Sequence, residues 1–154
     1  MNQMVNAYAA HQNVQIDGRE VDKRALLNCA ARLKIALDDG GKDMKMYQEA
    51  IRHNQHLWTL FQVALVDPSN PLKQETKIGL LRLSGYIDRV SFRAVTEYLP
   101  EALESLITIN RTVAAGLAKQ IQAAQSQAAA PQAQPQQQPQ PPASGQPLAF
   151  SIST

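Results

Sequence analysis

The chain has 154 residues, a formal net charge of +2 and a single cysteine, Cys29. A net charge this small gives no global argument for nucleic acid or an anionic membrane as partner. A lone cysteine excludes an internal disulfide and is typical of a reducing compartment. No apolar run approaches the roughly 18 residues of a membrane span, and the N-terminus has neither the basic nor the apolar region of a signal peptide. We therefore expect a cytoplasmic protein with no membrane contact.

The charged residues all lie between Asp17 and Lys119, whereas residues 122–154 are rich in Gln, Pro and Ala. Such a segment has too little apolar surface to offset the entropy lost on folding. We predict one folded helical domain over residues 1–121 and a disordered tail over residues 122–154. Within that tail, residues 147–152 (PLAFSI) are more apolar than their surroundings, which leaves open a short docking motif or chance.

The first long helix is predicted to begin at Asp17, after a short helical turn over residues 6–12. Asp17 is a good N-cap residue, and Glu20 three positions later completes a capping-box pattern. Gly40 and Gly41 offer the left-handed conformation that ends a helix. Between these signals, apolar residues recur at helical spacing on one face, namely Leu26, Cys29, Leu33 and Leu37.

Three further helices are predicted from similar signals. The second begins near Asp43 and stops at Pro68. The third begins at Asn70, with Pro71 at its first position, where a missing N–H costs nothing. The fourth covers about residues 101–122, after the break at Pro100. Four amphipathic helices with short connections predict an all-α, antiparallel helical bundle, with the short N-terminal helix in addition.

Asparagines interrupt two apolar stripes of this bundle. The second helix has the stripe Tyr47, Ile51, Asn54, Trp58, Phe61 and Leu65, and the fourth has Leu103, Leu106, Asn110, Val113 and Leu117. A buried amide costs stability unless it is hydrogen-bonded. Two explanations stay open: the asparagines fix which helix faces which, or they contact backbone groups of a partner protein.

The sequence contains no recognisable active-site motif. Glu49, His53 and His56 share one side of the second helix, where they could offer three ligands to a metal, but a solvated polar face is the simpler explanation. Cys29 lies on an apolar face, where burial makes a thiol inert. Neither a hydrolase elbow nor a phosphate-binding glycine motif occurs. We therefore expect no enzyme activity, no metal and no cofactor.

A basic edge is predicted on the third helix, where Arg82, Arg89 and Arg93 repeat at helical spacing. RNA recognition would call for exposed aromatic side chains as well, and we expect these to be lacking. A solvated outer face is the simpler interpretation.

Several short motifs, in this order and spacing, resemble the flagellar FlaF family. Asn54-x-x-Leu57-Trp58 is similar to an N-x-x-L-W stretch of that family, and Asn70-x-Leu72 is similar to its N-x-L stretch. Residues 106–111 (LITINR), followed by Gly-Leu at 116–117, are similar to its terminal pattern. The resemblance extends from about residue 7 to residue 117, and the Gln/Pro-rich tail is an addition to it.

The resemblance implies a cytoplasmic factor needed to make or export flagellin. The leading hypothesis is a flagellin-binding export chaperone that holds an amphipathic flagellin helix in a groove of the bundle. A second is a post-transcriptional regulator that acts on flagellin mRNA or opposes the repressor FlbT, and a third is an adaptor of the export apparatus. The candidate partner-binding residues, for which second-layer core is the alternative, are Asn54, Leu57, Trp58, Leu60, Leu81, Ile109 and Asn110.

Overall fold

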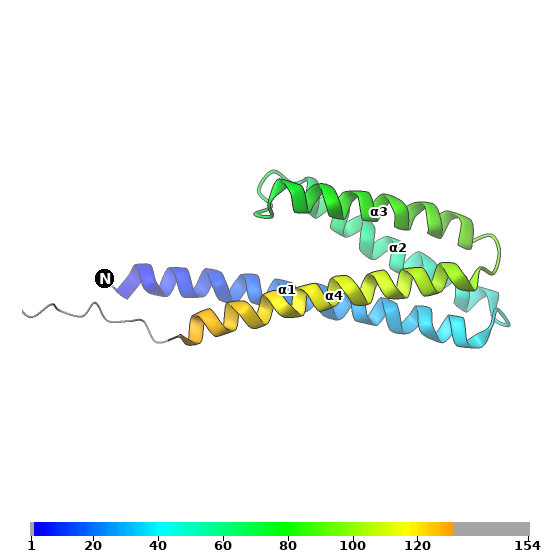
Figure 1. Ribbon diagram of the computed structural model, residues 1–154, viewed down its shortest axis with the longest axis horizontal. Helices are drawn as coiled ribbons and strands as arrows, with labels where there is room; N and C mark the ends of the chain where they lie inside the picture. The colour runs from blue at the N-terminus through cyan, green and yellow to red at the C-terminus, as the bar shows by residue number, and fades with distance from the viewer. Residues whose placement is uncertain (1, 131–154) are drawn as a thin grey trace, which may run out of the picture.

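The computed structural model describes residues 2–130, and within that range it has helices and no strand. The four helices are α1 (Asn2–Asp39), α2 (Met44–Val66), α3 (Gln74–Ala94) and α4 (Pro100–Ala129) (Figure 1). The all-α prediction is confirmed. The predicted disorder of residues 131–154, and the apolar segment at 147–152, lie outside the described residues.

Helix α1 is longer than predicted and continues through Asp17 without a break. The separate short helix and the start at Asp17 are therefore wrong. The carboxylate of Glu20 pairs with Nζ of Lys23 at 2.8 Å instead of reaching back to a cap. Gly18 lies inside the helix, where an added Cβ would meet nothing. Residues 2–16 contain neither proline nor glycine, so nothing local stops the helix.

The connection between α2 and α3 also differs from its prediction. Helix α3 begins at Gln74, four residues after the expected cap. Asn70 instead closes the loop: its Oδ1 accepts from the Leu72 N–H at 3.0 Å, and its Nδ2 donates to the Ala64 carbonyl at 2.9 Å. The asparagine side chain thus satisfies orphan backbone groups of a turn and of a helix C-terminus rather than those of a helix start.

Helix α4 passes the predicted domain boundary at residue 121 and ends at Ala129. Residues 122–129 are Gln, Ala and Ser only, and Gln and Ala favour helix. Ala130 is extended because the residue before a proline avoids the helical region, and Pro131 follows it. Helix α4 therefore ends just before this proline, and not at the point where charged residues stop occurring in the sequence.

The helices form two pairs of unequal length. Figure 1 shows α1 lying along α4, and the shorter α2–α3 hairpin packed over one part of them. The most extensive helix contact is between α1 and α4, whereas α3 touches α4 only slightly. The part of α1 before Val21 and the part of α4 after Leu117 extend beyond the hairpin, and we call these two segments the arm.

The end opposite the arm is fastened by two tyrosines. The hydroxyl of Tyr47 donates to the Glu97 carbonyl at 3.0 Å and accepts from the Leu99 N–H at 3.1 Å. The ring of Tyr98 lies 5.2 Å from that of Tyr47, centroid to centroid, and directly over Gly41. The α1–α2 and α3–α4 connections are therefore locked together at this end.

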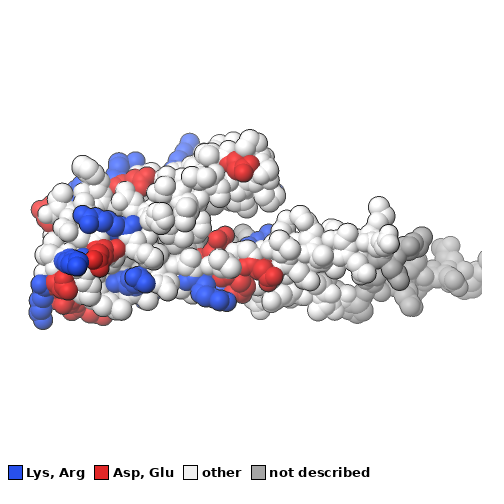
Figure 2. Space-filling model, turned by 180° about the vertical axis from the view of Figure 1, so that it is seen from behind, with Lys and Arg blue, Asp and Glu red and all other residues white. Residues whose placement is uncertain are grey.

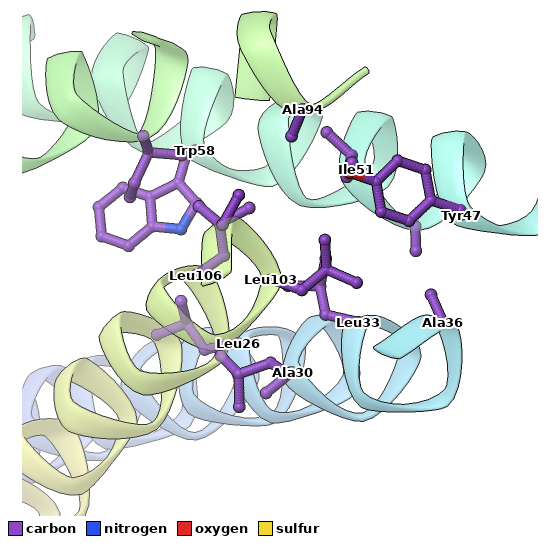
Figure 3. Packing of buried hydrophobic residues seen from close by; sticks show 14 of the residues in the cluster. Leu26, Ala30, Leu33, Ala36, Tyr47, Ile51, Trp58, Ala94, Leu103 and Leu106 are labelled. Atoms are coloured by element: carbon purple, nitrogen blue, oxygen red, sulfur yellow. The ribbon is translucent and has the colours of Figure 1, made fainter. Parts of the chain in front are cut away.

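The core lies between α1, α2 and α4, as Figure 3 shows for Leu26 and Leu33 of α1, Trp58 of α2 and Leu106 of α4. These four side chains are at most 1% exposed. Helix α3 contributes less, chiefly Ile87 and Ala94. None of the described helices combines the length and the apolar character that a membrane span requires.

Candidate functional site

The two asparagines on the apolar stripes meet in the core, together with Trp58. Asn110 Oδ1 accepts from Trp58 Nε1 at 2.9 Å, and Asn110 Nδ2 donates to Asn54 Oδ1 at 2.6 Å. All three side chains are buried. Their hydrogen bonds join α2 to α4 inside the core, which favours the explanation that the asparagines fix which helix faces which.

This network is complete at Asn110 and incomplete at Asn54. Nδ2 of Asn54 is buried and has no hydrogen-bond partner among the described residues. An unsatisfied buried donor costs roughly 1–3 kcal/mol. Asn54 therefore contributes to the network only as an acceptor, and Asn110 is the residue that holds the three together.

Two of the predicted partner-binding residues, Leu57 and Leu60, line one groove between α1 and α2. The groove has a volume of about 410 Å³. Its apolar surface includes Val21 of α1, which is 64% exposed, and Leu60, which is 53% exposed. Large side chains with this much exposure on both sides of a groove form a surface suited to an apolar partner.

The α1–α2 groove has basic and imidazole side chains and no carboxylate among its lining residues. Arg24 and Arg32 project from α1, and His53 and His56 from α2. Desolvation, followed by the charge of Arg32 and by His56, lowers the pKa of His53. The neutral form of His53 is therefore favoured more than that of an ordinary histidine, and Arg24 and Arg32 contribute positive charge to the groove.

Cys29 lines the same groove but is only 1% exposed. Burial raises the pKa of its thiol to about 11, an effect that the charge of Arg32 only partly offsets. A protonated, covered thiol is a packing group and not a nucleophile.

The structure does not bring Glu49 together with His53 and His56. The described part of the chain contains no group of three or more His, Cys, Asp or Glu side chains placed to hold a metal ion. His53 and His56 face the groove described above, and Glu49 is exposed beside Lys45, with a separation of 4.0 Å between Oε1 and Nζ.

Leu81 and Ile109, the other two predicted partner-binding residues, do not join Leu57 and Leu60. Both are half-buried, on α3 and α4, and Ile109 packs against the core. Neither lines the α1–α2 groove. The seven predicted residues thus fall into three groups. Asn54, Trp58 and Asn110 form the buried network, Leu57 and Leu60 line the α1–α2 groove, and Leu81 and Ile109 belong to neither.

A second pocket, which sequence reasoning missed, lies where the α2–α3 hairpin overhangs the root of the arm. Figure 2 shows the step there, with the hairpin projecting over the α1–α4 pair. This notch pocket has a volume of about 130 Å³, and all four helices and the α2–α3 loop line it. Its apolar residues include Trp58, Phe61, Leu65, Leu72, Leu80 and Leu117.

Asp22 is the only charged residue among those lining the notch pocket, and burial raises the pKa of its carboxyl. No distinctive sequence signal marked this pocket, because Leu80 and Leu117 have the spacing of ordinary core residues. It exists because α1 and α4 are longer than the helices that cover them.

The basic edge of α3 carries aromatic side chains, contrary to expectation. Tyr86 is 40% and Phe92 is 75% exposed on the helix that bears Arg82, Arg89 and Arg93. Arg93 shares a shallow recess with Glu101 of α4. On the face shown in Figure 2, positive and negative side chains are interspersed.

Comparison with models of protein families shows to which family the chain belongs. A model of the family described as "Flagellar protein FlaF" matches residues 4–117, about three quarters of the chain. The chain belongs to the FlaF family. Comparison with curated proteins and with solved structures finds no match.

Membership of the FlaF family indicates a role in flagellar biogenesis. The matched region ends at Leu117, so the arm segment of α4 and the rest of the chain lie beyond it. Several residues that carry the resemblance are brought together by the fold. Trp58, Asn70, Leu72 and Leu117 line the notch pocket, and Asn54 and Asn110 lie in the core behind Trp58.

Proposed function

We propose that this FlaF-family chain is a cytoplasmic flagellin-binding export chaperone. Its α1–α2 groove would hold an amphipathic flagellin helix before export. The observation that carries the proposal is the pairing of exposed apolar residues from two helices, Val21 and Leu60, along one groove. A helix laid in such a groove buries anchors at i, i+3, i+4 and i+7.

The charges of the groove limit which helix it suits. Arg24 and Arg32 contribute positive charge, and no carboxylate lines the groove. A partner helix with acidic residues beside its apolar stripe would pair with these arginines, and a basic one would be repelled. We therefore expect the recognised flagellin segment to be amphipathic and acidic at its edges.

Co-expression with a flagellin of the same genome, followed by affinity capture and gel filtration, tests the proposal. We expect a stable complex with the unchanged chain. Leu60→Asp places a charge in the groove and should weaken binding at least about tenfold, equivalent to ~1.4 kcal/mol. Leu27→Asp is the matched control, because Leu27 is also on the surface, at 45% exposure, but lies outside the groove.

Two results would count against the proposal in different ways. Absence of any complex, with both proteins folded and soluble, would reject direct flagellin binding. A complex that tolerates Leu60→Asp and Leu27→Asp equally would keep the chaperone function but move its site away from the α1–α2 groove.

A second candidate function is post-transcriptional regulation through flagellin mRNA. One observation favours it: Tyr86 is exposed on the same stripe of α3 as Arg82, Arg89 and Arg93. Aromatic and arginine side chains together stack on and pair with single-stranded RNA. A mobility-shift assay with the flagellin mRNA leader tests this, and binding that is insensitive to Arg89→Glu would exclude this stripe as the RNA site.

A further inference from the structure

The notch pocket has the size and chemistry to accept one aromatic side chain. Its volume is about 130 Å³, and an apolar cavity of about 150 Å³ is known to bind a benzene molecule. Trp58, Phe61 and Leu72 supply ring and branched surfaces around it. A phenyl ring placed there would lose its contact with water on most sides, which is favourable by the ordinary hydrophobic effect.

The chain itself carries a segment with matching chemistry. After Ala130 its only aromatic residue is Phe150, which is flanked by Leu148 and Ile152 at alternate positions. Alternate residues of an extended segment share one face. No charged residue follows Lys119, so such a segment would bring no charge into a pocket whose rim already holds Asp22.

The connecting chain is long enough to place this segment at the pocket. Leu117 lines the pocket, and Ala129 ends α4 twelve residues later. At ~1.5 Å per helical residue the chain must return about 18 Å. Nineteen residues lie between Ala130 and Phe150, and six of them are proline. A Pro-rich linker extends by ~3.1 Å per residue, so this one can reach about 60 Å and has ample length for the return.

A linker that can reach its site makes docking intramolecular, so the effective concentration of the segment at the pocket does not fall when the protein is diluted. A second copy of the chain at micromolar concentration supplies far less of the same segment. The geometry therefore favours capture by the same chain over exchange between two chains.

We propose that residues 148–152 fold back along α4 and dock in the notch pocket of their own chain, with the ring of Phe150 as the anchor. The docked segment would cover the root of the arm and bridge α2, the α2–α3 loop and α4. Any other ligand of the notch pocket would have to displace it. The proposal is independent of flagellin binding, because it concerns the chain alone.

Methyl and amide NMR spectra of the full-length chain test the docking. Phe150→Ala should shift the signals of Leu72, Leu80 and Leu117, because an aromatic ring alters the field at its neighbours. Phe92→Ala is the matched control, since it removes an exposed ring from α3 at a residue outside the notch pocket. It should leave those three signals unchanged.

Both remaining outcomes are decisive. Signals of Leu72, Leu80 and Leu117 that superimpose between the unchanged chain and Phe150→Ala would overturn the docking. If the difference is present but disappears on tenfold dilution, the segment docks in a second copy, and the assignment to its own chain is overturned. No flagellin is present, so failure here leaves the chaperone proposal untouched.

Discussion

The indole nitrogen of Trp58 donates to the side-chain oxygen of Asn110 across 2.9 Å, and so links α2 to α4 inside the core. The same asparagine donates from its nitrogen to Asn54. Asn110 thus uses both ends of its amide, whereas Asn54 uses one. Each asparagine interrupts one apolar stripe in the sequence, but in the structure Asn110 makes two side-chain hydrogen bonds and Asn54 makes one.

This inequality predicts different costs for the same substitution. Asn110→Leu leaves the Trp58 N–H and the Asn54 oxygen without partners, so we expect the free energy of unfolding to fall by about 2–4 kcal/mol. Asn54→Leu removes a donor that has no partner and orphans only the Asn110 nitrogen. We expect it to cost at least ~1 kcal/mol less than Asn110→Leu, and the bundle to stay folded. Urea denaturation of the two variants measures the difference, and equal costs would contradict this account of the network.

Neighbouring glycines provide a second matched pair. Gly40 and Gly41 both have positive φ, 69° and 79°. An added Cβ at Gly40 would meet nothing, but at Gly41 it would lie 2.8 Å from the Tyr98 ring. We expect Gly40→Ala to cost about 1 kcal/mol through backbone strain, and Gly41→Ala to cost about 1–3 kcal/mol more through overpacking. Thermal unfolding of both variants tests this, and similar melting temperatures would show that Tyr98 moves aside freely.

The carboxyl of Asp22 makes stability depend on pH. Because burial raises its pKa in the folded state, the folded chain holds this proton more tightly than the unfolded chain does. Stability is therefore lost as the pH rises from the ordinary value of 3.8 through the raised value. Asp22→Asn should be more stable than the unchanged chain at pH 7, and this advantage should vanish below about pH 3.8.

Chemical denaturation at a series of pH values measures the Asp22 contribution. Asp17→Asn, which changes an exposed carboxyl on the same helix, is the control and should show no comparable advantage. If the advantage of Asp22→Asn is the same at all pH values, its source is packing and not ionisation.

The thiol of Cys29 is expected to react slowly. With its pKa raised to about 11, from 9.0 for an ordinary thiol, it has about a hundredfold less thiolate at pH 8. Its burial slows the reaction further. A thiol reagent such as dithionitrobenzoate should modify the native chain at least about a hundredfold more slowly than the chain in denaturant. Comparable rates would mean that the α1–α2 groove opens readily.

Local signals in the sequence were sufficient where proline or glycine acts by itself. Gly40 and Gly41 end α1 with positive φ, and Asp43 caps α2 by accepting from the Met46 N–H at 3.0 Å. Pro100 begins α4, as the break before it predicts. The apolar stripe of α2 was predicted correctly too, since five of its six residues are buried and Phe61 is half-buried.

Local sequence signals gave wrong helix boundaries where tertiary packing also determines the length of a helix. The capping box at Asp17 and Glu20 is compatible with a helix start, but the residues before it are already helical and contain no proline or glycine to stop the helix, and α1 packs along α4. The notch pocket could not be predicted, because Leu26, Leu80 and Leu117 come from three helices distant in sequence. Their meeting depends on the relative lengths of the helices, which local patterns do not specify.

The contact between α1 and α4 has a consequence for synthesis on the ribosome. The main partner of α1 is the last described helix, and sixty residues separate Asp39 from Pro100. At ~5–20 residues per second, about 3–12 s pass between the emergence of the two. During that time Leu26 and Leu33 lack Leu103 and Leu106. A nascent chain therefore has to wait for its fourth helix before its own core can close, and the apolar face of α1 lacks its main cover until then.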